Sequence, residues 1–199
     1  MSPFKPFKQF LLHAAVALAI MGMAGVVGAA LVVYFGLYNI AAVAQHTLPV
    51  YTVLDIALRQ SIRQRAKHIE SPSLEDKSLI QAGFVRYHKN CVPCHGAPGI
   101  APGDAGKGML PLPTNLVESG RELTSAEIFW VVSNGIKMTG MPAWQYRFRD
   151  DEIWSIVAFV KYLPALSPKD YRSMAYSINA METAEAVSRE TQSSTNYLE

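Results

Sequence analysis

Apolar and polar residues fall in blocks along this chain of 199 residues, and the first block is almost wholly apolar. Residues 14–38 contain no charged side chain and no Asn, Gln or His. A helix of these 25 residues would be about 37 Å long, and the hydrocarbon core of a membrane is about 30 Å thick. The pattern therefore predicts a transmembrane anchor, preceded by a short cytoplasmic tail, within residues 1–45.

The length of the apolar stretch also bears on whether it is cleaved off. The small-residue sequence AVAQ at 42–45 resembles a signal-peptide cleavage site, with Lys5 and Lys8 as the basic start. The apolar core of a signal peptide normally runs only about 7–15 residues, so we expect a retained anchor. After the span the next basic residue is Arg59, and the positive-inside rule therefore predicts a cytoplasmic N-terminus.

This topology predicts a single-pass protein of a bacterial inner membrane, with its remaining residues in the periplasm. Small residues four positions apart, Ala24 with Gly28 and Gly25 with Ala29, would let a partner transmembrane helix approach closely. Gly and Ala are also common in membrane helices in general. A partner helix is therefore one of two interpretations of these pairs.

Residues 46–72 are expected to form an amphipathic basic linker helix, which begins at Thr47 and continues to about residue 69. Thr47 suits an N-cap and Pro49 suits a first turn. Apolar residues share one stripe of this helix, and cations gather in its last turns, namely Arg59, Arg63, Arg65 and Lys67. The helix could lie on anionic head groups, dock on an acidic partner or stand as a solvated stalk.

Residues 73–165 have the pattern of a compact all-α domain. Ile80, Phe84, Tyr87 and Cys91 recur at helical spacing and define one face of a first helix. A second helix is predicted over 125–134 and a third over 151–163. Their end signals are a capping box of Thr124 and Glu127, the stop residue Gly135, an acidic first turn at 150–152, and Pro164.

Ten of residues 96–122 are Gly or Pro, so we expect no regular element there. A long structureless connection inside a small domain argues against a fold unless something else organises it, and a buried cofactor would do so. Residues 166–199 are rich in Ser and Glu, and the composition predicts a polar, mostly disordered tail.

The two cysteines of the chain lie in the sequence CVPCH, as Cys91 and Cys94, directly before His95. A thioredoxin-type redox pair would need a surrounding βαβ pattern, and a structural zinc site would need further ligands that the sequence does not supply. C-x-x-C-H is the attachment signal for c-type haem. Both thiols would form thioethers with haem vinyl groups, and His95 would ligate the iron. The sequence therefore predicts one haem c per chain.

Four segments around this motif resemble a class I cytochrome c domain with a single haem, over about residues 73–164. They are GFVRYHKNCVPCHG, PTNL at 113–116, NGIKMTGMPAW at 134–144 and DDEIWSIVAFVKYL. The match is similar to soluble cytochromes and to haem domains of membrane oxidase subunits. The resemblance implies that Gly83 and Phe84 lie where the first helix crosses the last, near Trp154. It also implies that the Pro113 carbonyl accepts a hydrogen bond from His95 Nδ1.

The sixth ligand of the iron is expected to be a methionine. Met109 follows His95 too closely to reach the opposite haem face easily, and Met174 and Met181 lie in the polar tail, which leaves Met138 and Met141. The family pattern resembles Gly-Met-Pro at 140–142 and so implies Met141. Trp144 is expected to wall the haem, whereas Trp130 is equally well explained as a core residue.

These features predict an electron carrier that is not an enzyme by itself. No region is basic enough to indicate a nucleic-acid partner, and no catalytic dyad or second cofactor motif is present. The expected partners are the membrane and redox proteins such as a terminal oxidase, a quinol–cytochrome c reductase or a periplasmic dehydrogenase, with the chain a free carrier or a complex subunit. The alternative is a haem enzyme or gas sensor with an open iron position.

Overall fold

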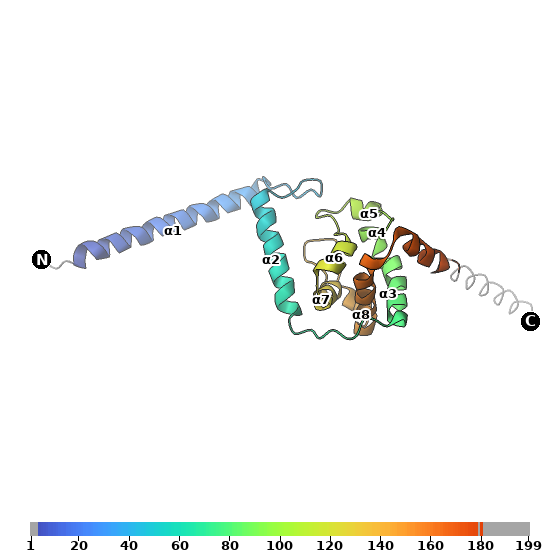
Figure 1. The fold of residues 1–199 in the computed structure, drawn as a ribbon. Coiled ribbons are helices and arrows are strands. Elements are labelled where there is room, and N and C mark those ends of the chain that lie inside the picture. Colours follow the sequence, from blue (N-terminus) through green and yellow to red (C-terminus); the bar gives the residue numbers. More distant parts are fainter. Residues whose placement is uncertain (1–3, 179, 181–199) are drawn as a thin grey trace, which may run out of the picture. The chain divides into compact units, whose positions relative to one another are not determined.

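The computed structural model describes residues 4–178 and 180, and the chain divides into two units, Met1–Ala44 and Gln45–Glu199 (Figure 1). The first unit contains helix α1, Phe4–Tyr34. Within its section Phe7–Tyr34, a window of 18 residues has a mean hydropathy of 2.5, and no part of that window is buried. Among the described residues, α1 is the one helix long and apolar enough to cross a membrane, so the predicted apolar N-terminal helix is confirmed.

The second unit is built from helices, and its described residues contain no strand, which confirms the all-α prediction. Its longer helices are α2 (Leu48–Ala66), α3 (Lys77–Asn90), α6 (Leu116–Glu122), α7 (Ser125–Asn134) and α8 (Asp150–Tyr162). Its short helices are α4 (Val92–His95), α5 (Asp104–Lys107), η1 (Trp144–Tyr146) and η2 (Leu163–Ala165). A further helix covers residues 168–178.

The core forms where α3 crosses α8. Gly83 of α3 lies so close to the Ser155 carbonyl of α8 that any side chain at position 83 would overlap it. The next residue, Phe84, is fully buried, with its ring centroid 5.2 Å from that of Phe159. The absence of a side chain at Gly83 therefore allows the two helix backbones to approach at the expected place, where the neighbour of Trp154, Ser155, makes the direct contact.

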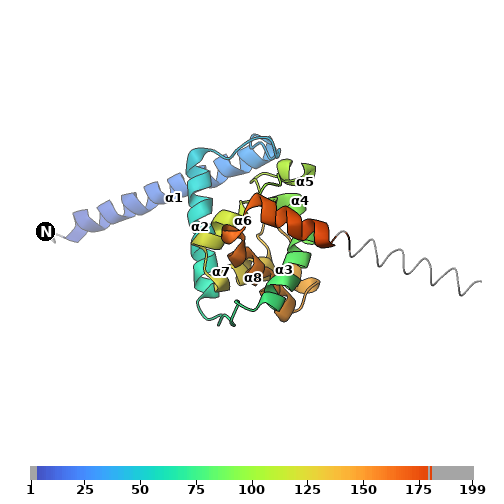
Figure 2. The ribbon, with the colours of Figure 1, turned by 45° about the vertical axis from the view of Figure 1, so that its right-hand side comes forward.

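The helix of residues 168–178 differs from the disordered tail predicted there. The helix itself is the orange-red one in Figure 2. Its Tyr171 is fully buried, with its ring centroid 5.5 Å from that of Phe84. Its hydroxyl lies 3.0 Å from Nδ1 of His88. Ala175 and Ile178 are buried on the same face. Three apolar residues at helical spacing therefore dock an otherwise polar segment, while residues 181–199 of the predicted tail lie outside the described residues.

The Gly- and Pro-rich stretch also contains more regular structure than expected, because α5 and α6 lie within residues 96–122. The Asn115 side chain accepts a hydrogen bond of 3.0 Å from the Val117 amide and so caps α6. At the other end of α6, Lys161 Nζ donates to the Gly120 carbonyl at 2.7 Å. Capping at both ends stabilises a helix of only seven residues.

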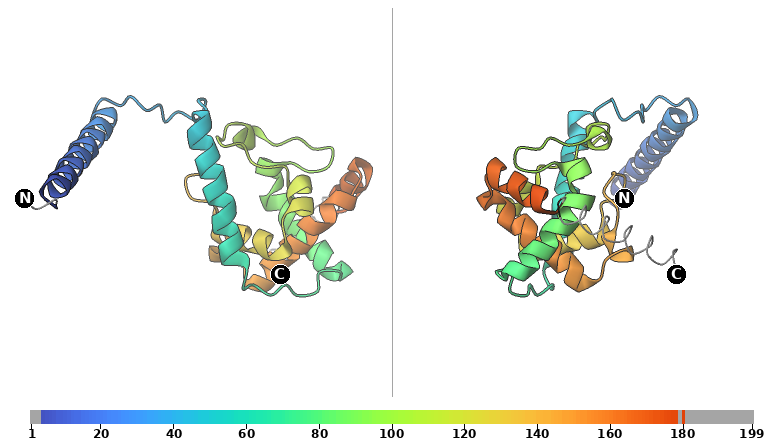
Figure 3. Two further views of the ribbon diagram at one scale, coloured as in Figure 1. Left: turned by 60° about the vertical axis from the view of Figure 1, so that its left-hand side comes forward. Right: turned by 90° about the vertical axis from the view of Figure 1, so that its right-hand side faces the viewer.

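Helix α2 packs on α7, and Figure 3 shows it along one side of the second unit. Its buried residues are Ile62 and Ala66, both in its second half. Arg65 lies over the ring of Trp130 on α7, with its guanidinium carbon 5.9 Å from the ring centroid. The helix begins where predicted, but Thr47 makes no side-chain capping bond.

Candidate functional site

The CVPCH sequence forms a tight helical turn at the end of α3. Cys91 ends α3 and also begins α4. Its carbonyl accepts hydrogen bonds from the amides of Cys94, at 3.1 Å, and His95, at 2.8 Å. Both cysteines are free. One turn of backbone therefore carries two thiols and an imidazole in a fixed order.

His95 is oriented by a backbone carbonyl. Its Nδ1 lies 2.8 Å from the carbonyl oxygen of Thr114. Because a carbonyl oxygen only accepts, Nδ1 carries the proton and Nε2 keeps its lone pair. Burial lowers the pKa of His95, and the bond to Thr114 opposes that shift. The imidazole is thus held in the neutral tautomer whose Nε2 can bind a metal.

The position of this hydrogen bond corrects the expectation for Pro113. The acceptor is the carbonyl of Thr114, one residue further along the chain. Thr114 lies between Pro113 and Asn115, whose side chain caps α6. The carbonyl that meets His95 is therefore the one directly before the start of α6.

Close backbone packing supports the CVPCH turn. Gly106 lies against the carbonyl of Cys94, where a side chain would overlap it. The Gly103 amide donates to the Pro93 carbonyl at 2.9 Å. Behind the turn, the buried Tyr87 hydroxyl donates to the Gly96 carbonyl at 2.8 Å. The turn is therefore fixed from both sides by segments that lie before and after it.

The environment of Cys91 does not suit a redox-active thiol. Burial, with a smaller contribution from the neighbouring Cys94, raises the pKa of Cys91 to about 12. Nucleophilic and redox cysteines need a lowered pKa, because the thiolate is the reactive form. This favours the haem interpretation of the pair over the thioredoxin-type one.

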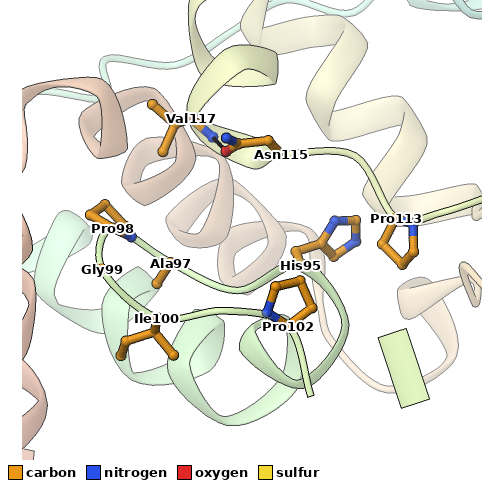
Figure 4. Close-up of a pocket in the computed structure, with 9 residues that line it drawn as sticks. All are labelled: His95, Ala97, Pro98, Gly99, Ile100, Pro102, Pro113, Asn115 and Val117. Carbon is orange, nitrogen blue, oxygen red and sulfur yellow. Dashed lines mark hydrogen bonds between the residues drawn. The ribbon is translucent and has the colours of Figure 1, made fainter. Parts of the chain in front are cut away.

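A pocket of about 290 Å³ lies beside His95 (Figure 4). Its walls come from residues 97–102 and 113–117, with Pro102 and Pro113 nearest to the imidazole in the view. Both segments belong to the Gly- and Pro-rich stretch. That stretch therefore leaves open space next to the imidazole instead of packing over it.

The two candidate methionines have different surroundings. Met141 is partly buried and packs against the core. Met138 has a φ of 62° and is 92% exposed. Exposure on this scale leaves the Met138 side chain without the packing that would hold it against a buried cofactor. The structure therefore favours Met141 as the residue that could supply a sulfur ligand.

Hydrogen bonds of Thr139 order the loop that carries Met141. The Thr139 hydroxyl donates to the Ile136 carbonyl at 2.8 Å and accepts from the Met141 amide at 3.1 Å. The Ile136 amide donates to the Met141 carbonyl at 3.2 Å. Gly135 starts the loop at a φ of 65°, and a Cβ there would lie 2.6 Å from the Met141 carbonyl oxygen. Sequence analysis missed the role of Thr139.

Met109 also lies beside the loop that carries Met141, although its position in the sequence argued against a role as an iron ligand. Its sulfur contacts Gly140, directly before Met141. No side chain at position 140 competes for that space. Met109 therefore packs beside the methionine loop, a contact that no periodicity in the Gly- and Pro-rich stretch could have revealed.

The tryptophans are divided between the loop and the α2 interface. Trp144 starts η1 just after the methionine loop and stacks on Phe148, with ring centroids 5.5 Å apart. Arg147 lies 5.9 Å from the Trp144 ring centroid. Trp130 instead contacts Arg65 of α2. Trp144 therefore lies directly after the methionine loop, and Trp130 lies at the contact between α7 and α2.

The donor groups fit a c-type haem. Cys91 and Cys94 offer free thiols, and His95 Nε2 has no hydrogen-bond partner among the described residues. Met141 offers a soft thioether. Within residues 4–178 and 180, no three His, Cys, Asp or Glu side chains are grouped so that they could hold a metal ion. The thiols and imidazole therefore suit a cofactor that brings its own iron and ring nitrogens.

Comparison with known proteins points in the same direction. Residues 78–160, from α3 to α8, match the family model described as cytochrome c oxidase, cbb3-type, subunit III. No curated protein matched the chain. The match and the apolar helix α1 together fit a membrane-anchored monohaem cytochrome c. Domains of this type transfer electrons through haem and are not enzymes by themselves.

Proposed function

We propose that this chain, whose residues 78–160 match a cytochrome c family, carries single electrons between membrane or periplasmic redox proteins. Cys91 and Cys94 would attach one haem c, and His95 and Met141 would ligate its iron. The observation that carries the proposal is the CVPCH turn, where Thr114 holds the proton of His95 on Nδ1 and leaves Nε2 available.

The chain's own residues would set the properties of the bound haem, which itself supplies a one-electron iron couple. The Thr114 carbonyl orients the imidazole and raises its basicity through the Nδ1 proton. The Met141 thioether would stabilise reduced iron and so raise the potential. Two protein ligands would also close the iron to small molecules. The close crossing of α3 and α8 would hold the CVPCH turn, which follows directly at the end of α3.

Carbon monoxide binding tests the carrier mechanism. Reduced protein with both axial positions filled should give little carbon monoxide difference spectrum. Rapid and complete binding to the unmodified protein would mean an open iron position, as in a haem enzyme or gas sensor. That result would contradict the carrier proposal.

We further propose that α1 is retained as an anchor with its N-terminus in the cytoplasm and the haem domain in the periplasm. The support is the placement of Lys5 and Lys8 before the span, together with haem c attachment outside the cytoplasm. Anchoring raises the effective concentration of the carrier near membrane partners. Mass spectrometry of protein purified from membranes should find residues 1–44, whereas an N-terminus at Gln45 would indicate a secreted carrier.

The proposed partners are those of a respiratory complex. The support is the family description, a subunit of a cbb3-type oxidase. A terminal oxidase would then accept the electron, and a quinol–cytochrome c reductase or a periplasmic dehydrogenase would donate it. Purification in mild detergent should recover an oxidase with the chain. Recovery of the chain alone at full haem occupancy would favour a free carrier.

A further inference from the structure

The first half of helix α2 carries an exposed apolar surface that haem binding does not explain. Six large apolar side chains in this half are between 38% and 76% exposed: Leu48, Val50, Tyr51, Val53, Leu54 and Ile56. At about 100° of rotation per residue, these positions fall on all sides of the helix. Contiguous exposed apolar surface of this kind marks an interaction site.

The second half of the same helix is fixed to the rest of its unit. Ile62 is 7% exposed and Ala66 is 3% exposed. Arg65 covers the Trp130 ring of α7 at 5.9 Å, and Figure 3 shows α2 beside the other helices of the unit. The exposed apolar half of α2 is therefore directly continuous with a half that packs against the rest of the unit.

The segment that precedes this surface also contains no charged residue. No Asp, Glu, Lys or Arg occurs between Lys8 and Asp55, so the uncharged run continues well past the end of α1 at Tyr34. The connection over residues 35–47 contains exposed apolar residues as well, namely Phe35, Leu37, Tyr38, Ile40 and Val43. A chain that left the membrane directly for water would be expected to carry charges at this point.

The length of this connection limits how far α2 can move from the anchor. The 14 residue-to-residue steps from Tyr34 to Leu48 span at most about 3.6 Å each, so the start of α2 stays within about 50 Å of the end of α1. If α1 crosses a membrane, the charge-free start of α2 is therefore able to reach that membrane's surface.

We propose that the charge-free start of α2, Leu48–Leu54, enters the head-group and acyl boundary of the membrane in which α1 is anchored. The proposal rests on the anchor part of the proposed function, and not on the haem ligands. Lipid fits this surface better than a protein groove, because a groove buries one face of a helix and lipid surrounds all faces. Tyr51 suits the interface, where amphipathic aromatic rings gather.

The charges of α2 mark where the helix returns to water. Asp55 pairs with Arg59 at 2.9 Å, and both side chains are at least one-third exposed. Arg63 and Arg65 follow in the last turns. Because α2 is 19 residues long, about 28 Å at 1.5 Å per residue, the insertion would hold the haem domain close to the membrane and present one constant face to partners.

Fluorescent labels on the full chain with haem attached test this insertion. Single-cysteine variants Leu48→Cys and Val53→Cys place a polarity-sensitive label in the apolar half, and Gln64→Cys is the matched control on the exposed part of the same helix. Cys91 and Cys94 are consumed by the haem, and the unsubstituted protein measures any residual labelling. The proteins are placed in phosphatidylethanolamine–phosphatidylglycerol vesicles with or without brominated acyl chains.

We expect labels at positions 48 and 53 to emit at shorter wavelength and to lose intensity with brominated lipid, and the label at 64 to do neither. A water-like label at 53 would overturn the proposal and indicate a surface kept for a protein partner. A shielded label that bromine does not quench would also overturn it, in favour of self-association. A Val26→Cys label in α1 tests the anchor separately, so failure of the anchor is distinguishable from failure of the α2 insertion.

Discussion

The two regions that would hold the iron ligands are built differently. His95 lies on a helical turn that is held by backbone hydrogen bonds, close glycine contacts, the link to Thr114 and the fully buried side chain of Tyr87. Met141 lies in a loop that depends on the Thr139 side chain and on the unusual backbone of Gly135. We infer that His95 is the permanent ligand and that Met141 is the one most easily lost by mutation.

The largest effect should come from the thiols of the turn. Replacing both cysteines, as Cys91→Ser with Cys94→Ser, should abolish covalent haem, because no other cysteine exists to form a thioether. Peroxidase staining after denaturing electrophoresis would measure this as complete loss of the haem band. An unchanged band in the double variant would refute covalent attachment at the turn.

The next largest effect should come from the methionine itself. Met141→Ala should remove the far-red sulfur-to-iron absorption band, lower the reduction potential and admit carbon monoxide to the reduced iron. Met138→Ala is the matched control, because Met138 is 92% exposed and should leave all three properties unchanged. The opposite pattern would assign the ligand to Met138.

A smaller effect should follow from the backbone of the methionine loop. Gly135→Ala forces a side chain into a left-handed conformation and within 2.6 Å of the Met141 carbonyl, which should cost about 1–3 kcal/mol. Gly140→Ala is the control, because the added methyl would meet only the movable end of Met109. Thermal loss of the far-red band should occur at a clearly lower temperature in Gly135→Ala. Equal midpoints would show that the loop backbone does not hold the ligand.

The smallest effect should come from Thr139. Thr139→Val removes the hydroxyl that links Ile136 and Met141 and should destabilise the loop by about 1 kcal/mol. Thr139→Ser keeps the hydroxyl and should behave nearly as the unmodified protein does. Thermal melting followed at the far-red band compares the two. A larger loss in the Ser variant would mean that the methyl group of Thr139, not its hydroxyl, orders the loop.

The difference between local contacts and contacts far apart in the sequence explains what the sequence could and could not predict. The CVPCH turn and the capping box of Thr124 with Glu127 depend on local spacing, and the structure contains both. The α3–α8 crossing at Gly83 was implied by the resemblance to a class I cytochrome c domain, and the structure contains it too. Partners far apart in the sequence carry no such pattern. The contact between Met109 and Gly140 and the shift from Pro113 to Thr114 are of that kind.

The helix of residues 168–178 shows a different limit of prediction from sequence. The composition of residues 166–199 is polar on average, and this composition predicted disorder. Three buried positions, Tyr171, Ala175 and Ile178, dock it on the core, and Met174 packs there partly buried. Their spacing was a usable signal, but it has meaning only when a complementary surface on Phe84 and Phe159 is known to exist.

The central claim, that His95 and Met141 both ligate the iron of one attached haem, is tested most directly by nuclear magnetic resonance. The reduced full chain would be prepared in detergent with its methionine methyl groups labelled with carbon-13. The account predicts one methyl signal shifted far upfield by the haem ring, which disappears in Met141→Leu and persists in Met138→Leu and Met109→Leu. No upfield methyl signal in a protein that retains its covalent haem would contradict the account.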